Sequence, residues 1–593
     1  MLLLALLSSP AQASGYYFAD SGARAIARGG AFVAGADDLT AQYYNPAALT
    51  RIERPTLSLN GWMVQQYVRF DRADEPGTCG APDPGDGSDP CVFGAVENEA
   101  PPMKEPSFGY ATRLGGLHPK LANTVLAVGL YPPTGPSMTY PEDGAQRYTL
   151  TDALVLQAWA GPSLATQVTP WLSVGAGLQW SFLEIEQGLT ASLCFTEEGC
   201  VTGTDNPAND IGLQIEASDF NQWSGNVGVL AQPTPWLDIG ASWQPGSTYS
   251  ANGSLGAAFS QDFPLASQLN GLAFKDEDIR LDVTLPQTAR LGVQVKPTPT
   301  VRVEAAGTWT QWSALDALVV TDLDLLVEGN PDGIAPDGFL IEDDVVLPTG
   351  YSDSWSARLG GDWQVAPWAR VAAGAHYETS AVPPATQGVN IVDGDKWGVG
   401  GGATFQIGKH LALDVSAART MFPDRDVTDS ELRQLSLYAN IADPEAAGVV
   451  NGKVVGNGAF ASHLSFLALG ATWSFGEANN KAQRVVEAPT ALPVTVPPAP
   501  PPTVPLAITT PDTEGKNADV ERAVLTCAAQ DPSGSGAWGV QYDVTARGVA
   551  LEVEVTGPRG AARSTEVCIE KAVKAMPFSS GEARTERQTV TAP

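Results

Sequence analysis

A short phrase recurs along the chain, and it constrains the fold more than any other feature of the sequence. Each copy predicts a strand, a tight polar or proline turn and a second strand, because proline fixes the φ of a turn and cannot donate to a central ladder. The four clear copies are QVTPWLSVGAGLQW from Gln167, AQPTPWLDIGASW from Ala231, VKPTPTVRVEAAGTW from Val295 and WQVAPWARVAAGAHY from Trp363. Two weaker copies, LHPKLANTVLAVGLY and IGKHLALDVSAART, begin at Leu117 and Ile407.

The spacing of these turns predicts the number of strands. Successive turns lie 52, 65, 64, 68 and 42 residues apart, measured between Pro119, Trp171, Trp236, Thr300, Trp368 and His410. Each interval holds two strands and one long loop, and short turns opposite long loops are typical of bacterial outer-membrane barrels. A barrel of n strands with both ends on the short-turn side has n/2 − 1 short turns, so six turns predict fourteen strands. We expect them near 56–70, 105–116, 121–131, 150–167, 172–185, 221–233, 237–250, 278–296, 300–312, 351–365, 369–382, 396–407, 411–422 and 463–476.

Alternation along the last predicted strand distinguishes its two faces. One face suits lipid and the other, made of small or polar residues, suits a lumen. A soluble β-sandwich would alternate too, but its strands would need two apolar faces packed together and covered edges. A closed barrel has no edges, so we expect an all-β fold, an antiparallel transmembrane barrel. The lipid-facing set is Leu467, Leu469, Ala471, Trp473 and Phe475.

The first residues predict export from the cytoplasm. Residues 1–13 join a leucine-rich run to the triplet Ala11-Gln12-Ala13, which together resemble the apolar core and cleavage site of a signal peptide. A positive n-region is missing, so the true start lies upstream or the signal is weak; a short buried helix is the alternative. No run of 18 apolar residues follows, which excludes a helical membrane span. We expect the bacterial outer membrane, with both termini in the periplasm.

Cysteines and charge narrow the class of protein. The six cysteines fall into three local pairs, which favours disulfides in an oxidising compartment. The four histidines are scattered, so we expect no metal site and no cofactor. A net charge of −32 excludes a general nucleic-acid binder. Acids crowd residues 71–104 and 313–350, which are predicted to be loops rather than strands. The expected pairs are Cys79/Cys91, Cys194/Cys200 and Cys527/Cys568.

Residues 14–54 precede the first strand and are rich in small side chains. A fourteen-stranded barrel is wide enough to leave a water-filled hole unless something fills it. The stretch SGARAIARGGAFVAGADD, from Ser21, allows close packing inside a lumen. We therefore expect residues 14–54 to plug the barrel, residues 55–476, from the periplasmic side.

The same stretch carries a family resemblance. SGARAIARGGAFVAGADDLTAQYYNPAALTRIERPTLSL closely resembles the N-terminal hatch of the FadL/TodX-type outer-membrane transporters of long-chain fatty acids and hydrocarbons. Other similar segments are VGLYPPTGP at 128–136, GPSLATQVTPWLSVGAGLQ at 161–179, WTQWSALDAL at 309–318 and AAGAHYETSAVPP at 372–384. The resemblance covers roughly 14–476 and implies a fourteen-stranded barrel with a hatch. It places Asn45, Pro46 and Ala47 in the hatch motif, where they either serve hatch movement or form only a rigid turn.

The resemblance also implies a function, namely passive uptake of hydrophobic compounds. Long-chain fatty acids are the leading cargo, captured at extracellular loops, bound in the lumen beside a cation and released when the hatch moves. Family members release ligand sideways through a kinked third strand, and Pro132 and Pro133 are candidates for such a gate; an ordinary strand end is the alternative. Aromatic hydrocarbons are the alternative cargo, and a structural or adhesin barrel the alternative function. No Gly-x-Ser-x-Gly elbow supports a lipid hydrolase, so no catalytic residue is expected.

After residue 476 the chain departs from the family pattern. Residues 477–512 form a proline-rich linker that should be extended and fairly stiff. Residues 513–593 predict a small α/β module with Cys527 and Cys568 at helix positions, and this module resembles TonB-C-terminus-like domains. We expect it in the periplasm, where it would dock a partner protein or bind peptidoglycan; a tail without a partner is the alternative.

Overall fold

The computed structural model describes two compact units, which divide between residues 488 and 489. This division falls inside the predicted linker, whose residues 477–512 lie outside the described residues, as does the predicted signal peptide. Each unit is therefore described by itself. The described residues are 20–75, 91–132, 135–194, 205, 210–259, 277–315, 317–321, 324–327, 339–342, 345–438, 448–476, 513–529, 536–544, 550–558, 563–574, 576 and 584–592.

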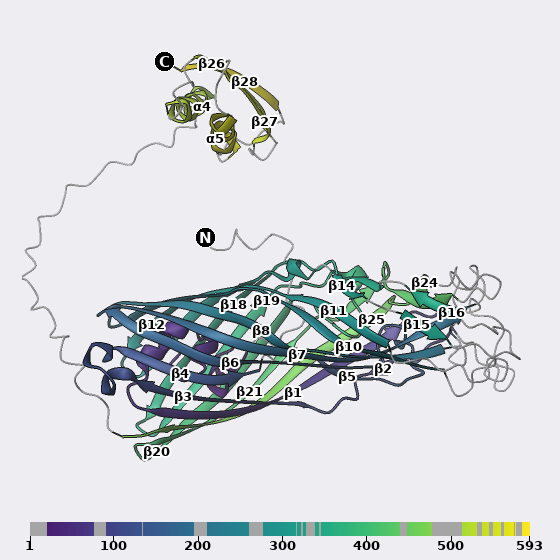
Figure 1. The fold of residues 1–593 in the computed structure, drawn as a ribbon. Coiled ribbons are helices and arrows are strands. Elements are labelled where there is room, and N and C mark those ends of the chain that lie inside the picture. Colours follow the sequence, from purple (N-terminus) through teal and green to yellow (C-terminus); the bar gives the residue numbers. More distant parts are fainter. Residues whose placement is uncertain are drawn as a thin grey trace, which may run out of the picture. The chain divides into compact units, whose positions relative to one another are not determined.

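The larger unit is a closed, antiparallel β-barrel with tilted strands (Figure 1). Its wall has fourteen strands, with β9/β10 and β11/β12 each counted as one interrupted strand. Neighbours in the chain pair with one another, and β1 pairs with β25 from Thr56–Ser474 to Arg72–Gly458, which closes the ring. The strand number predicted from the six turns is confirmed. The wall strands are β1 (Thr56–Arg72), β3 (Met103–Arg113), β4 (Thr124–Tyr131), β6 (Asp152–Thr169), β7 (Leu172–Cys194), β8 (Asp210–Thr234), β9 (Leu237–Gln244), β10 (Ser247–Phe259), β11 (Glu277–Leu285), β12 (Thr288–Thr298), β13 (Val301–Thr310), β18 (Ser354–Ala366), β19 (Ala369–Glu378), β20 (Lys396–Ile407), β21 (Leu411–Met421) and β25 (Gly458–Ser474).

The two faces of the wall follow the alternation in the sequence. In β25, Leu467 and Leu469 are 47% and 61% exposed on the outside, whereas Ala468 between them is 1% exposed on the inside. Tryptophans at the short turns, such as Trp171 and Trp368, are also exposed outside, as expected of an aromatic girdle at the edge of a bilayer. The barrel therefore presents an apolar surface to lipid and smaller or polar groups to its lumen.

The expectation that residues 313–350 are only loop is wrong. Short runs of β-branched and aliphatic residues between the acids pair into hairpins, because such runs favour strands even in an acidic stretch. In residues 71–104, likewise, β2 pairs with β1 and β3 begins at Met103. The added strands are β2 (Val96–Glu97), β5 (Ser137–Thr139), β14 (Ala317–Thr321), β15 (Asp324–Val327), β16 (Phe339–Glu342), β17 (Val345–Pro348), β22 (Arg425–Val427), β23 (Arg433–Tyr438) and β24 (Gly448–Val454).

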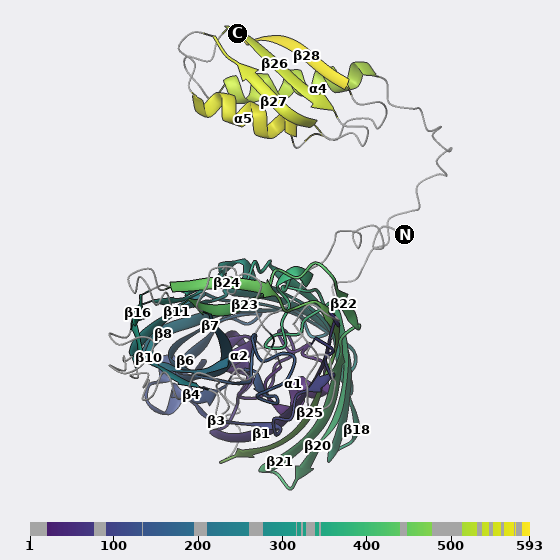
Figure 2. The ribbon, with the colours of Figure 1, turned by 90° about the vertical axis from the view of Figure 1, so that its right-hand side faces the viewer.

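An N-terminal segment, residues 20–52, lies within the barrel (Figure 2). It contains α1 (Ala23–Ala27), α2 (Ala41–Tyr44) and the 3₁₀ helix η1 (Pro46–Arg51). Helix α1 contacts β19, β20, β21 and β25, and η1 contacts β6, β7 and β8 on other parts of the wall. The segment thus spans the lumen between separate groups of strands. Further 3₁₀ turns are η2 (Leu114–Gly116), η3 (Pro119–Leu121), η5 (Trp312–Ala314) and η6 (Pro384–Thr386).

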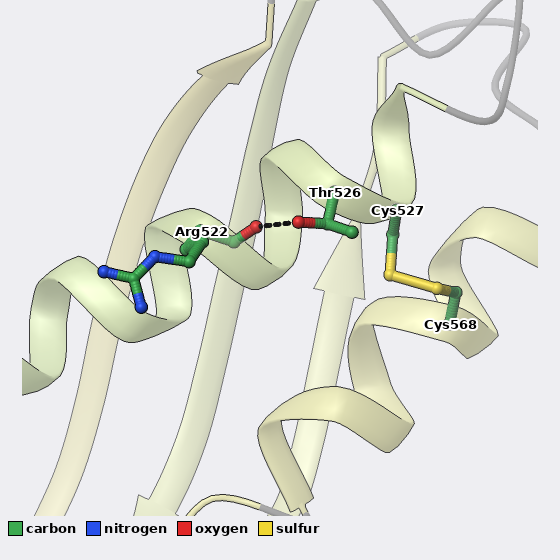
Figure 3. Close-up of a disulfide and its surroundings, with 4 residues drawn as sticks. All are labelled: Arg522, Thr526, Cys527 and Cys568. Atoms are coloured by element: carbon green, nitrogen blue, oxygen red, sulfur yellow. Dashed lines mark hydrogen bonds between the residues drawn. A yellow bond between two sulfur atoms is a disulfide. The ribbon is translucent and has the colours of Figure 1, made fainter. Parts of the chain in front are cut away.

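The smaller unit is a three-stranded sheet with two helices. Strands β26 (Gly536–Val544), β27 (Ala550–Thr556) and β28 (Arg584–Ala592) pair in the order β27-β26-β28. Helices α4 (Thr513–Ala528) and α5 (Arg563–Lys574) pack against each other, and Trp538 and Ile569 are buried in the core. A disulfide between Cys527 and Cys568 joins the helices, with a Cα–Cα distance of 5.9 Å (Figure 3). Among the helices the structure describes, none is both long and apolar enough to cross a membrane.

Candidate functional site

The turn Arg28-Gly29-Gly30 brings the N-terminal segment against the wall. Gly29 and Gly30 have φ values of 60° and 75°, a region that side chains disfavour. Opposite them, a Cβ atom on Gly360 or Gly374 would come within 2.1 or 2.0 Å of the Arg28 carbonyl oxygen. Glycine at these wall positions therefore lets the segment and the strands approach backbone to backbone.

The Asn45-Pro46-Ala47 motif joins the N-terminal segment to itself and to the wall. The Asn45 side chain donates to the Val33 carbonyl at 3.1 Å and to the Val229 carbonyl of β8 at 3.0 Å. Its Oδ1 accepts from the Ala47 N–H at 3.1 Å and so caps η1, whose first residue is Pro46. Asn45 is fully buried. The structure places the three motif residues together in the lumen, whereas their part in movement stays a prediction.

Glu304 of β13 is the centre of the main ionic contact between segment and wall. Its carboxylate accepts from the backbone N–H groups of Val33 and Ala34 at 2.7 Å and of Gly35 at 2.9 Å. It also accepts from the Arg28 guanidinium at 2.9 Å, and both side chains are almost wholly buried. A buried carboxylate with four donors is well compensated, so this contact holds the segment in one position.

Further ion pairs tie the same segment to four more strands. Arg24 bonds Asp414 of β21 at 2.9 Å, and Asp37 lies 2.8 Å from Arg302 of β13. Removing one partner of such a buried pair leaves an uncompensated charge, which costs about 3–5 kcal/mol. Moving the whole segment would break all these pairs together. The other pairs are Arg28–Asp362, Arg51–Asp238, Arg370–Asp37 and Arg358–Asp20.

A pocket lies between the N-terminal segment, the wall and the loop after β19. Its cavity volume is about 50 Å³, and part of the pocket is open to solvent. Its apolar lining includes Ile26, Val392, Val399, Phe422, Leu464 and Phe466, and its charged lining is Asp20, Arg358, Glu378, Asp393 and Lys396.

The two cations of this pocket have carboxylate partners. Lys396 Nζ lies 2.7 Å from Asp393 and 3.4 Å from Glu378, and it also lies over the Phe422 ring. Arg358 bonds Asp20 at 2.7 Å and Glu378 at 3.2 Å. Burial raises the pKa of Asp393, in the loop, to about 6, although Lys396 acts in the opposite direction. The negative charge that Asp393 presents to Lys396 therefore changes with pH near neutrality.

Among the described residues, ladder pairing stops where the third wall strand, β4, ends. The β3–β4 ladder stops at Phe108–Leu130 and the β4–β6 ladder at Tyr131–Trp159. Strand β5 resumes pairing with β6 only at Leu154. Among the described residues, 103–107 of β3 pair with a strand only on the β1 side and 156–158 of β6 only on the β7 side, while the Val155 N–H donates to the Pro136 carbonyl at 3.1 Å.

Pro132 has no N–H to donate to a ladder, which fits the end of β4 at Tyr131. Pro132 follows the last residue of β4 and is buried, whereas Pro133 lies outside the described residues. Pro136, at the far end of the interruption, lines the pocket. The Asn98 side chain joins β1 and β5 by donating to the carbonyls of Gln66 and of Ser137, the residue after Pro136. Pro136 thus lies next to the pocket, and a gate at Pro132 and Pro133 stays a prediction.

Of the predicted cysteines outside the smaller unit, Cys91 and Cys194 are disulfide-bonded. Cys79 and Cys200 lie outside the described residues, so these two pairings stay predictions. Sequence reasoning missed the charged pocket residues altogether. The only signal for Arg358, Glu378 and Lys396 is a polar residue at a luminal position of a strand, which many other positions share.

A closed barrel whose lumen holds its own N-terminal segment defines an outer-membrane transport protein. The model of the family described as outer membrane protein transport protein (OMPP1/FadL/TodX) matches residues 4–459. The chain belongs to this family, and it is accordingly an outer-membrane transporter of hydrophobic compounds rather than an enzyme.

Individual relatives are distant. Outer membrane protein NMB0088 of Neisseria meningitidis serogroup B is 20% identical over 494 residues, which cover 80% of this chain and 97% of that protein. A FadL homologue of Pseudomonas aeruginosa has a similar fold, with a TM-score of 0.60 and 17% identity over 78% of this chain and 100% of the other. The toluene transporter TbuX of Ralstonia pickettii gives a TM-score of 0.51 and 17% identity over 77% and 99%.

Proposed function

We propose that the transporter takes up long-chain fatty acids and similar long amphiphiles. The observation that carries this proposal is the pocket, where apolar Ile26, Leu464 and Phe466 lie beside the cations Lys396 and Arg358. An apolar wall takes up a tail, and a cation next to it attracts a carboxylate. The paired carboxylates of the pocket would reorganise when the ligand head arrives.

The route begins at the extracellular loops, which capture the poorly soluble ligand, and continues into the pocket. Residues 20–52 act as the hatch. Because their ion pairs with the wall make displacement of the whole hatch costly, we propose a local shift at Asp20, whose carboxylate contacts Arg358 inside the pocket. That shift would open the pocket toward the interruption at Pro132–Pro136, and the ligand would leave sideways into the bilayer.

A second cargo class, aromatic hydrocarbons, is favoured by one observation. Both pocket cations already have carboxylate partners, with Asp393 only 2.7 Å from Lys396, so an uncharged ligand could bind without disturbing them. The similar fold of the Ralstonia pickettii toluene transporter is consistent with this alternative.

Mass spectrometry of compounds that co-purify with the detergent-extracted protein tests the proposal. We expect fatty acids from the wild type and about tenfold less from a Lys396→Met variant, because one charge-assisted contact is worth roughly 1.5–3 kcal/mol. Lys104→Met, on the outer face of β3, is the matched control. Recovery of aromatic compounds alone, or equal fatty acid from both variants, would contradict the fatty-acid proposal.

For the smaller unit we propose a periplasmic position, tethered by the proline-rich residues 477–512, and contact with a periplasmic protein or with peptidoglycan. Its support is that the unit follows β25 in the chain, and that β25 ends beside Thr56 at the short-turn edge of the barrel. Co-sedimentation of the full chain with purified peptidoglycan, against a chain ending at residue 488, tests the second partner. Equal sedimentation of both chains would reject it.

A further inference from the structure

Arg290 of β12 is a cation of the lumen without a carboxylate partner. Its neighbours Leu291 and Val293 are 56% and 39% exposed on the outside of the wall, so Arg290 points inward. The guanidinium lies over the ring of Tyr43, 4.8 Å from the centroid, and therefore faces the N-terminal segment. Among the residues that the structure describes, the Arg290 side chain has neither an ion pair nor a hydrogen bond.

Other luminal arginines differ from Arg290 in this respect. Arg28, Arg302 and Arg358 each contact at least one carboxylate. Charged groups inside a protein are normally paired, and a guanidinium has five N–H donors that a ring contact leaves unused. The position of Arg290 therefore fits an anionic ligand that supplies the missing partner.

Hydroxyl groups lie beside Arg290 on the same face of the wall. The ladders pair Arg290 with Thr308 of β13, and Thr308 with Ser356 of β18. A second luminal row, two positions further from the short turns, also consists of hydroxyl-bearing residues. That row is Thr288, Thr310 and Ser354. Within the described part of the chain, only the Ser356 hydroxyl of these two rows has a hydrogen-bond partner, the Arg358 guanidinium at 3.1 Å.

A cavity of about 40 Å³ lies between these rows and the N-terminal segment, which lines it with Tyr43 and Tyr44. A water-sized group needs about 10–15 Å³ of such volume, so the cavity has room for roughly three. It therefore fits a polar head group but not a tail. The apolar pocket beside Lys396 is its neighbour, because both are lined by the ion-paired residues Asp20, Arg358 and Glu378. The shift of Asp20 proposed above would join the two and give the tail a place next to the head.

The chemistry of the cavity indicates which head group it binds. We propose that Arg290 and the surrounding hydroxyl groups form a head-group site for hydroxylated fatty acids. The planar guanidinium fits a carboxylate with two parallel hydrogen bonds. A carboxylate alone leaves the hydroxyls of Thr308 and Thr310 unused, whereas a ligand hydroxyl close to the acid, as in a 3-hydroxy acid, both donates to them and accepts from them. This inference rests on the proposed function, and it narrows the cargo to amphiphiles with a second polar group beside the acid.

Two probes of equal chain length test the preference, 3-hydroxytetradecanoate and tetradecanoate. Binding of each radiolabelled acid to the purified full chain in detergent is measured at about pH 8, where both acids are ionised. We expect the wild type to bind the hydroxy acid about fivefold more tightly, as one additional neutral hydrogen bond would give. Thr308→Val combined with Thr310→Val keeps the side-chain shapes and removes two hydroxyls, so it should make the two affinities equal. Thr248→Val, at an exposed position of β10, is the matched control and should keep the preference.

The charge of Arg290 is tested separately. Arg290→Gln should weaken the binding of both acids about tenfold and leave their ratio unchanged, because the charge-assisted contact is lost while the hydroxyls remain. Arg419→Gln, at an exposed position of β21, is the matched control and should change neither affinity.

The outcomes separate this inference from the proposed function. Binding of neither acid by the wild type would contradict the proposed function. Equal affinity of the wild type for both acids would overturn the head-group site and leave the proposed function standing. A preference that survives the double threonine variant, or unchanged affinities in Arg290→Gln, would have the same meaning.

Heat-modifiable migration on a gel confirms that each variant has a folded barrel. If Arg290→Gln fails this check, Arg290→Lys replaces it, and both acids should still bind more weakly because an ammonium lacks the planar fork. If the double threonine variant fails, Thr308→Val alone replaces it and should reduce the preference for the hydroxy acid.

Discussion

The Arg28 guanidinium donates to the Glu304 carboxylate at 2.9 Å across 276 positions of sequence. Arg28 belongs to the N-terminal segment and Glu304 to β13, and their side chains are 2% and 0% exposed. This pair thus joins a part of the chain made before the barrel to a strand in the middle of its wall. The position of the N-terminal segment therefore depends on the folded barrel.

Replacement of Arg28 should loosen the segment. Arg28→Ala leaves Glu304 without its cation, so we expect the segment to lose about 3–5 kcal/mol of its attachment to the wall. Hydrogen exchange of residues 20–52 should increase, and the barrel in a planar bilayer should conduct ions. Arg69→Ala, in an exposed pair with Glu97, is the control. Unchanged exchange in the Arg28 variant would contradict the ionic attachment.

Asn45 offers a test of hatch movement. Asn45→Ala removes the hydrogen bonds to the Val33 and Val229 carbonyls, at about 0.5–1.5 kcal/mol for each bond. We expect uptake of a labelled fatty acid to change by more than fivefold while the barrel stays folded by heat-modifiable migration. Normal uptake by Asn45→Ala, and by a variant in which Pro46 is also replaced, would mean that the motif is only a rigid turn with no part in hatch movement.

The prolines at the end of β4 should be required for sideways exit. Pro132→Thr with Pro133→Val restores two backbone donors, so β4 should extend along β3 and β6 and close the proposed gate. Uptake into cells should fall several-fold, whereas ligand binding by the purified protein should persist. Pro245, between β9 and β10 at another break in the wall, supplies the control substitution Pro245→Thr. Equal uptake by both variants would exclude Pro132 and Pro133 as the gate.

Asp393 should make ligand binding depend on pH. Burial raises the pKa of its carboxyl to about 6, so the folded chain holds this proton more tightly than the unfolded chain does. The contribution of Asp393 to the free energy of unfolding therefore falls as the pH rises from about 4 to about 6. Below about pH 6 the Asp393 carboxyl is protonated in the folded chain, so Lys396 loses one counter-charge. A carboxylate ligand should then bind more tightly.

The measurement is displacement of a fluorescent fatty acid between about pH 5 and pH 7.5, above the usual range of carboxyl pKa values. The wild type should bind more tightly toward the acid end, and Asp393→Asn should bind tightly throughout. Asp424→Asn, at an exposed position, is the control. A wild-type affinity independent of pH would exclude competition between Asp393 and the ligand for Lys396.

The disulfide of the smaller unit should stabilise it. Cys527 and Cys568 are 41 residues apart, and a bond that closes such a loop contributes about 2–4 kcal/mol. Cys527→Ser, Cys568→Ser and the double variant should show the same loss, read as trypsin cleavage of the full chain in urea. A larger loss in the double variant would mean that the two side chains contribute separately.

The sequence predicts the barrel well because its information is local and repeated. Each turn copy sets two strands, and the exposed Trp171 and Trp368 mark the same edge of the wall. The ion pairs are different, since Arg28 and Glu304 lie far apart in the chain and nothing local connects them. The hairpins within residues 313–350 are not predicted, because acids separate their short aliphatic runs.

The glycines on the inner face of the wall have a consequence for the permeability of the outer membrane. Gly360 and Gly374 are small because the Arg28 backbone occupies the space beside them, and side chains that would otherwise narrow the lumen are missing at that level. With the N-terminal segment dislodged, the barrel would be a smooth, wide conduit through which bulky antibiotics and detergents could enter. Cells that produce such a variant should become sensitive to drugs that an intact outer membrane excludes.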